Sequence, residues 1–138
     1  MSHASLSPPH KVLTALLEAA VDGGNPFLGI ENHLPQKPKG RTVVVGAGKA
    51  VGRMAEAFES LWKGSFGGVV VGRHGSTSSV SKIRFMTASH LVPDEAGLLA
   101  SEALLSAVSG LTKDDLVVAL ISGGGSALLP APMEGLSL

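Results

Sequence analysis

The sequence predicts an α/β fold with a doubly wound, mostly parallel sheet, and three observations predict it. Short apolar or β-branched runs alternate along the chain with segments of helical periodicity. Two of these runs lead directly into glycine-rich loops, as strands of parallel sheets often do. Aromatic residues make up only 4% of the chain. Small aliphatic side chains must therefore do most of the packing, which is usual in such sheets.

The first part of the chain is expected to hold an arm, a helix and a long connection. Residues 1–10 contain two prolines and little that could be buried, so we expect a flexible arm. Residues 11–138 are then the domain, which is long enough for one hydrophobic core. It begins with a helix whose apolar face is formed by Leu13, Leu16, Leu17 and Ala20 and which ends at Gly23 and Gly24. The polar, proline-containing segment Asn25–Arg41 predicts a connection over the surface.

The remainder of the chain alternates strands and helices. Strands are expected at residues Thr42–Val45, Gly67–Gly72, Lys82–Ala88 and Leu116–Ile121. The charges of Lys82–Ala88 favour a position at an edge of the sheet. Apolar residues recur at helical spacing from Val51 to Leu61 and from Ala96 to Leu111. Pro93, Asp94 and Glu95 form a typical start for the second of these helices.

The most informative stretch is Leu116–Leu129, which reads LVVALISGGGSALL. Its first six residues are all apolar and predict a strand buried on both faces. The loop Ser122, Gly123, Gly124, Gly125 and Ser126 follows, and Ala127–Leu129 could then begin a helix. A strand, a glycine loop and a helix N-terminus in this order favour phosphate or carboxylate binding by free backbone N–H groups. The alternative is a tight turn that needs glycine only for its geometry.

A second glycine loop, Gly46–Gly52, begins like a dinucleotide-binding fingerprint. Val51 stands where the third glycine should be, and no acid follows the next strand. Arg73 does stand there and could hold a 2′-phosphate, so an NADPH-dependent enzyme remains an alternative. Lys49 lies at the start of its helix, where a cation opposes the helix dipole. An anion bound between the two would resolve this conflict, and we therefore expect Lys49 to contact phosphate.

The sequence argues against a hydrolase and against a metal site held by protein side chains. Leu128 fills the last glycine position of a nucleophile elbow around Ser126, and no histidine follows it. The five histidines share no metal-ligand spacing. His90, at the end of a predicted strand, is a further candidate for the site. Asp94 is another, although its simplest role is to complement the helix dipole.

Composition restricts the partners and the compartment. The formal net charge is zero with no basic block, which argues against nucleic acid and a membrane surface as partners. The absence of cysteine excludes disulfides and thiol chemistry. The N-terminus lacks the apolar segment of a secretion signal, and no apolar run approaches the ~18 residues needed to span a bilayer. We therefore expect a cytoplasmic protein.

Four segments together resemble a known family. They are Val44–Ala55 (VVGAGKAVGRMA), His90–Gly97 (HLVPDEAG), Leu111–Leu120 (LTKDDLVVAL) and Ile121–Pro130 (ISGGGSALLP). In order and spacing they resemble the N-terminal, Rossmann-like domain of the class II glycerate 2-kinases, proteins often labelled hydroxypyruvate reductases. The resemblance covers nearly the whole chain from Lys11 on. One departure is Leu91, which stands where the family usually has a proline after this histidine.

The resemblance implies ATP-dependent phosphorylation of D-glycerate at its C2 hydroxyl, with Mg²⁺. Lys49 matches the family's active-site lysine, and Gly123–Ser126 match its phosphate or substrate loop; Gly46, Gly48 and Ser122 complete our candidate site. The family's proteins are longer, and their active site lies between two α/β domains. We therefore expect this chain to supply the N-terminal half of a site completed by a second domain or partner chain. An NAD(P)H-dependent hydroxypyruvate reductase and a non-catalytic anion-binding module remain alternatives, and a homo-oligomer is compatible with each.

Overall fold

The structure, a computed structural model, describes residues 8–138, so most of the expected N-terminal arm lies outside the described residues. The helices are α1 (Pro9–Gly23), α2 (Pro26–Glu31), α3 (Val51–Leu61) and α4 (Glu95–Ala107). The strands are β1 (Thr42–Ala47), β2 (Gly67–Arg73), β3 (Ile83–Ala88) and β4 (Leu116–Ile121). A single turn of 3₁₀-helix, η1, spans Ser126–Leu128.

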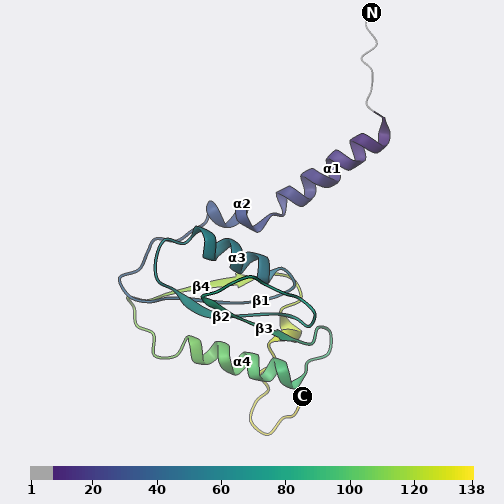
Figure 1. Ribbon diagram of the computed structural model, residues 1–138. Coiled ribbons are helices and arrows are strands. Elements are labelled where there is room, and N and C mark those ends of the chain that lie inside the picture. Colours follow the sequence, from purple (N-terminus) through teal and green to yellow (C-terminus); the bar gives the residue numbers. More distant parts are fainter. Residues whose placement is uncertain (1–7) are drawn as a thin grey trace, which may run out of the picture.

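The strands form one parallel sheet in the order β3-β2-β1-β4. Figure 1 shows α3 on one face of this sheet and α4 on the other. The predicted doubly wound α/β fold is therefore confirmed, with every strand pair parallel. The strand order changes direction between β1 and β4, and ligands of such sheets bind beyond the carboxyl ends of strands at this point. The two glycine loops follow these two strands.

The core lies on both sides of β1, whose six residues are all buried. On the face covered by α3, Val44 and Val70 pack with Phe58 and Trp62, and the two aromatic rings stack with centroids 5.2 Å apart. On the face covered by α4, a second cluster consists of Ala47, Val71, Ala88, Ala100 and Leu128. The ends of β1 and β2, and hence the loops that follow them, therefore rest on closely packed residues.

The prediction that Leu116–Ile121 is buried on both faces is wrong for the described chain. In β4 the side chains of Val117 and Ile121 are 42% and 63% exposed. The reason is that β4 is an edge strand, while α4 packs mainly on β2 and β3. The expectation of an edge position for Lys82–Ala88 is confirmed, because β3 forms the other edge.

The N-terminal helix forms as expected but begins at Pro9, in the first turn, where proline is tolerated. All of α1 is exposed, and Figure 1 shows it projecting from the sheet. The expectation of an irregular connection from Asn25 to Arg41 is wrong in part. Pro26–Glu31 forms α2, because Asn25 caps it by accepting a hydrogen bond from the Phe27 N–H (3.1 Å), with proline at the first helical position.

Two other helix boundaries differ from expectation. The helix expected to run to Leu111 ends at Ala107, and Gly110 takes φ +63° in the turn that follows. The helix expected after Ser126 is only the turn η1, because Pro130 cannot continue a helix. Within the described residues, no helix is long and apolar enough to cross a membrane.

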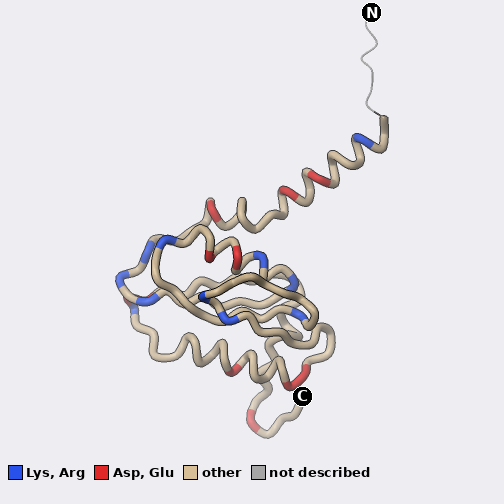
Figure 2. Tube along the Cα trace, viewed as in Figure 1, with Lys and Arg blue, Asp and Glu red and all other residues tan. Residues whose placement is uncertain are grey.

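Charged side chains are spread over most elements of the domain. Figure 2 shows acidic segments on α1 and α3, whereas basic segments gather where the chain enters β1. That end of the sheet is opposite to the glycine loops, which follow the carboxyl ends of β1 and β4. This basic group therefore forms no part of the candidate site.

Candidate functional site

The two glycine loops are joined by hydrogen bonds. The Lys49 N–H donates to the Gly123 carbonyl (3.0 Å), and the Ala50 N–H donates to the Ser122 hydroxyl (3.0 Å). In the opposite direction, the Ser122 N–H donates to the Ala47 carbonyl (3.1 Å). The loops after β1 and β4 thus form one connected structure, which places the predicted site residues of both loops together.

A third loop reaches the same place. The imidazole of His90, which follows β3, lies so close to Gly124 that a Cβ there would be 2.6 Å from its Nε2 atom. The same Cβ would be 3.1 Å from the Lys49 Cε atom. Lys49, His90 and Gly124 therefore meet, although each comes from a different loop. The Lys49 side chain, with its ammonium group, and the His90 imidazole, which both lie against Gly124, make this the candidate anion site.

The donors of this site come from the loop itself. Within the described part of the chain, the backbone N–H groups of Gly123, Gly124 and Ser126 donate no hydrogen bond. The short η1 turn adds no helix dipole, so the expected helix N-terminus behind this loop is replaced by free loop amides. The N-terminus of α3 also lacks a side-chain cap, because Ala50 occupies that position. The free N–H groups available to an anion are thus those of the loop after β4, because the N–H groups of Lys49 and Ala50 in the β1 loop already donate to that loop.

Asp94 is placed beside this cluster, and its carboxylate is already engaged. One oxygen accepts the N–H groups of Gly97 (3.0 Å) and Ser89 (3.2 Å). The other lies 2.8 Å from Nε2 of His74. The hydrogen bond from His74, with those from the backbone, holds the pKa of Asp94 below its usual value. Sequence reasoning missed His74, because nothing in the pattern links it to a carboxylate twenty residues away.

The described residues do not fit a magnesium site of their own. They contain no group of three or more histidine, aspartate or glutamate side chains that could hold a metal ion. Asp94, the one carboxylate beside the glycine loops that the sequence suggested, uses both oxygens in protein contacts. In the described structure, Asp94 is therefore not available as a Mg²⁺ ligand, and no chemical step is assigned to the ion.

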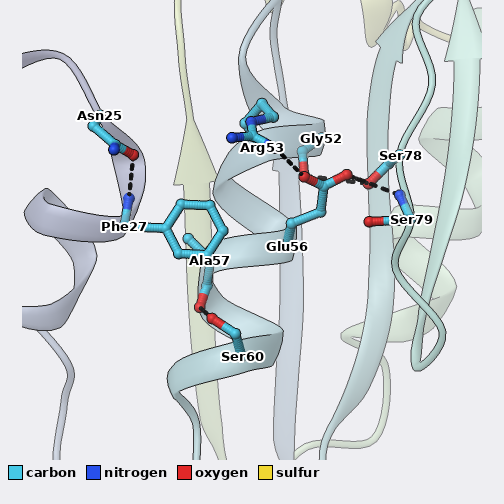
Figure 3. A network of polar contacts seen from close by, with 9 residues as sticks. All are labelled: Asn25, Phe27, Gly52, Arg53, Glu56, Ala57, Ser60, Ser78 and Ser79. Atoms are coloured by element: carbon cyan, nitrogen blue, oxygen red, sulfur yellow. Dashed lines mark hydrogen bonds and ion pairs between the residues drawn. The ribbon is translucent and has the colours of Figure 1, made fainter. Parts of the chain in front are cut away.

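The loop between β2 and β3 borders the site and is fixed to α3 by two carboxylates. Glu56 accepts the Ser79 N–H (2.8 Å) and the Ser78 hydroxyl (3.2 Å), as Figure 3 shows. One turn later, Glu59 accepts the N–H and hydroxyl of Ser81. The loop crosses the first turn of α3, where Gly52 lies against it. These carboxylates therefore fix the loop between β2 and β3 against α3, and the Glu56 contacts lie next to the first turn of that helix.

Acidification is expected to release this loop. The hydrogen bond from the Ser79 N–H is the main cause that lowers the pKa of Glu56. Burial acts to raise the pKa of Glu59, but hydrogen bonds from Ser81 and Lys82 outweigh it and lower that pKa. A lowered pKa in the folded state stabilises the fold above the ordinary value of 4.5, and this contribution is lost as the pH falls through the lowered pKa.

Thermal melts between pH 7 and pH 3 test this expectation. The double variant Glu56→Gln, Glu59→Gln is expected to have a lower Tm at pH 7 and a weaker fall of Tm on acidification. Glu102→Gln, on the exposed surface of α4, is the matched control and should follow the original chain. Parallel Tm curves for the double variant and the original chain would contradict the role of these carboxylates.

The parallel sheet, with two glycine loops that join at its switch point, defines the class of doubly wound α/β domains. The chain belongs to the family described as "Domain of unknown function (DUF4147)", whose model matches residues 12–138. This match, together with the relatives and the solved structures that follow, confirms the family resemblance and the α/β fold expected from the sequence.

Relatives of the chain carry two kinds of name. A protein of Agrobacterium vitis named "Putative hydroxypyruvate reductase" is 46% identical over 93% of this chain and 30% of its own length. The D-glycerate 2-kinase of Thermotoga maritima is 35% identical over 93% of this chain and 31% of its own length. The chain thus spans about a third of the length of these relatives. Some relatives are thus named as glycerate kinases and others as hydroxypyruvate reductases.

Two solved structures match the fold. The crystal structure of glycerate kinase from Thermotoga maritima superposes with a TM-score of 0.83 at 32% identity, covering 92% of this chain and 31% of that one. A crystal structure of a Pyrococcus horikoshii protein gives 0.82 at 29% identity, covering 96% of this chain and 33% of that one. The described fold therefore matches about a third of the solved Thermotoga maritima glycerate kinase chain.

Proposed function

We propose that this chain supplies the N-terminal half of a site that phosphorylates D-glycerate at its C2 hydroxyl with ATP. The observation that carries the proposal is the meeting of Lys49 with the free N–H groups of the Gly123–Ser126 loop. Relatives named glycerate kinase support the choice of reaction, and they support ATP as the phosphoryl donor. Mg²⁺ enters only as the ion that accompanies ATP in solution.

The geometry suits phosphoryl transfer because this reaction needs positioning and charge neutralisation more than covalent help from the protein. In the proposal, the Lys49 ammonium balances negative charge on the transferred phosphoryl group. The loop N–H groups donate to phosphate or carboxylate oxygens, since they have no acceptor among the described residues. His90 adds a ring donor at the same loop. The second half of the site would present the remaining groups.

The reductase alternative is weaker at the β1 loop. A dinucleotide-binding loop uses its glycines to bring the pyrophosphate close to the backbone. Here a Cβ at Gly48 would lie 2.2 Å from the Ser122 Oγ atom, so the loop Ser122–Ser126 occupies the place where a pyrophosphate would approach. That loop also takes the N–H groups of Lys49 and Ala50. The donors that a pyrophosphate would need are therefore in use.

A ligand-dependent melt of the 138-residue chain tests the proposal. A ligand at a hundred times its Kd adds about 2.7 kcal/mol of stability. We expect MgATP to raise the Tm and NADPH to leave it unchanged. ADP release that depends on D-glycerate would then separate a kinase from a non-catalytic binding module. A rise with NADPH and none with MgATP would contradict the proposal and favour the reductase.

A further inference from the structure

We infer that Asp94 is a positioning residue of the candidate site: its carboxylate fixes the loop that carries His90, and His74 braces that carboxylate. This inference rests on the proposed function only in assigning to His90 a bound anion as its ligand. The position of His90 itself can be measured without any ligand.

The path of the loop that carries His90 indicates that other residues must fix it in place. His90 follows β3, an edge strand, yet its ring lies against Gly124, which follows β4 at the opposite edge. The loop must therefore pass over the carboxyl ends of β2 and β1. His74, directly after β2, lies on this path. The backbone N–H of His74 donates to the Ala88 carbonyl (2.8 Å).

Packing alone does not hold this loop. Leu91 and Val92, the residues after His90, are 79% and 74% exposed. Leu91 also has φ +105°, in a region that residues other than glycine rarely adopt. Such a conformation is strained and persists only where neighbouring contacts enforce it. A proline, whose φ is fixed at about −65°, could not take this conformation.

Asp94 supplies contacts on both sides of the strained turn. Its Oδ1 atom accepts the Ser89 N–H before the turn (3.2 Å) and the Gly97 N–H after it (3.0 Å). Its Oδ2 atom lies 2.8 Å from the His74 Nε2 atom, and the other ring nitrogen of His74 is 3.2 Å from the Thr87 hydroxyl. One side chain thus connects the start of α4, the His90 loop and the end of β2.

A purely structural reading would make Asp94 only the N-cap of α4. Asp94→Ser separates the two roles, because serine is an equally good N-cap residue. Its single hydroxyl, one bond closer to the backbone, cannot also hold the His90 loop and reach His74. A second variant, His74→Ala, leaves the cap intact and removes only the brace. Asp115→Ser is the matched control. Asp115 accepts the N–H groups of Arg41 (2.6 Å) and Thr112 (2.7 Å), before β1 and β4 at the other end of the sheet.

The test is an NMR measurement of the nuclear Overhauser effect between the His90 ring and the Gly124 α-protons in the unliganded chain. We expect Asp94→Ser to abolish it, His74→Ala to weaken it, and Asp115→Ser to leave it unchanged. Circular dichroism confirms that α4 is retained in each variant. A nuclear Overhauser effect of unchanged intensity in Asp94→Ser would overturn the inference. Disappearance of this nuclear Overhauser effect in Asp115→Ser would overturn it as well.

A titration with inorganic phosphate, followed through the His90 ring resonances, links the position to binding. We expect phosphate to bind about tenfold more weakly to Asp94→Ser than to the original chain or Asp115→Ser, as for one missing hydrogen bond. An original chain in which His90 lies against Gly124 but does not respond to phosphate would contradict the proposed function and leave the positioning role of Asp94 supported. The Asp94→Ser variant could lose the contact of His90 with Gly124 and still bind phosphate as tightly as the original chain. This result would show that His90 takes no part in anion binding, and would overturn the link of His90 to the site.

Discussion

Replacing Gly68 with alanine is expected to prevent the domain from folding. Gly68 lies in β2 opposite Val44 of β1 and has φ +150°. A Cβ there would lie 1.8 Å from the Val44 carbonyl oxygen, a backbone atom in the centre of the core. Relief would require the pairing of β1 with β2 to break. The cost is therefore comparable with the whole stability of such a domain, about 5–15 kcal/mol.

The neighbouring Gly67→Ala is the matched control. A Cβ at Gly67 would meet only the Lys82 carbonyl oxygen at 3.7 Å, an ordinary contact. Urea unfolding followed by circular dichroism should show a cooperative transition for Gly67→Ala within about 1 kcal/mol of the original chain. Gly68→Ala should show no such transition. A cooperative transition in both variants would mean that β1 and β2 can separate locally without unfolding the core.

The order and type of the main elements could be predicted from the sequence because each has a local cause. The β-branched run from Thr42 predicts a strand, and the helical spacing of apolar residues from Val51 predicts a helix. In each segment the apolar pattern reflects whether one face or two faces are buried. The exposure of β4 could not be predicted, since an all-apolar run reads the same whether or not a helix covers it. The short helix α2 was missed although Asn25 and Pro26 form a typical helix start, because the prolines around it suggested an irregular segment.

For the site, the sequence predicted the two glycine loops and Lys49 but not how the loops are held together. Both loops follow predicted strands, and the carboxyl ends of parallel strands lie at one edge of a sheet. That these two strands flank the switch point became visible only in the structure. The approach of His90 to Gly124 depends on a loop that crosses two strand ends, which no local pattern encodes. The contact of His74 with Asp94 joins separate loops and likewise becomes visible only in three dimensions.

Replacing Lys49 with alanine is expected to have the largest effect on binding. Lys49 is exposed, precedes the uncapped N-terminus of α3 and lies against Gly124. Loss of a charged donor to phosphate costs about 1.5–3 kcal/mol, which corresponds to roughly 10–100-fold weaker binding of MgATP. Isothermal titration calorimetry with MgATP measures this change. Lys63→Ala is the matched control, because Lys63 is exposed just beyond the other end of the same helix.

In the chain without ligand, Lys49→Ala is not expected to lower the stability of the fold, although it weakens binding. A cation at a helix N-terminus opposes the dipole, so its removal should leave the free chain as stable as before or about 0.3–1 kcal/mol more stable. A variant that keeps its Tm but no longer responds to MgATP would show that Lys49 serves the ligand and not the fold. Lower stability together with unchanged MgATP affinity would contradict the role, because Lys49 would then support packing of the two loops. The opposite signs of the two effects therefore separate a binding lysine from a structural one.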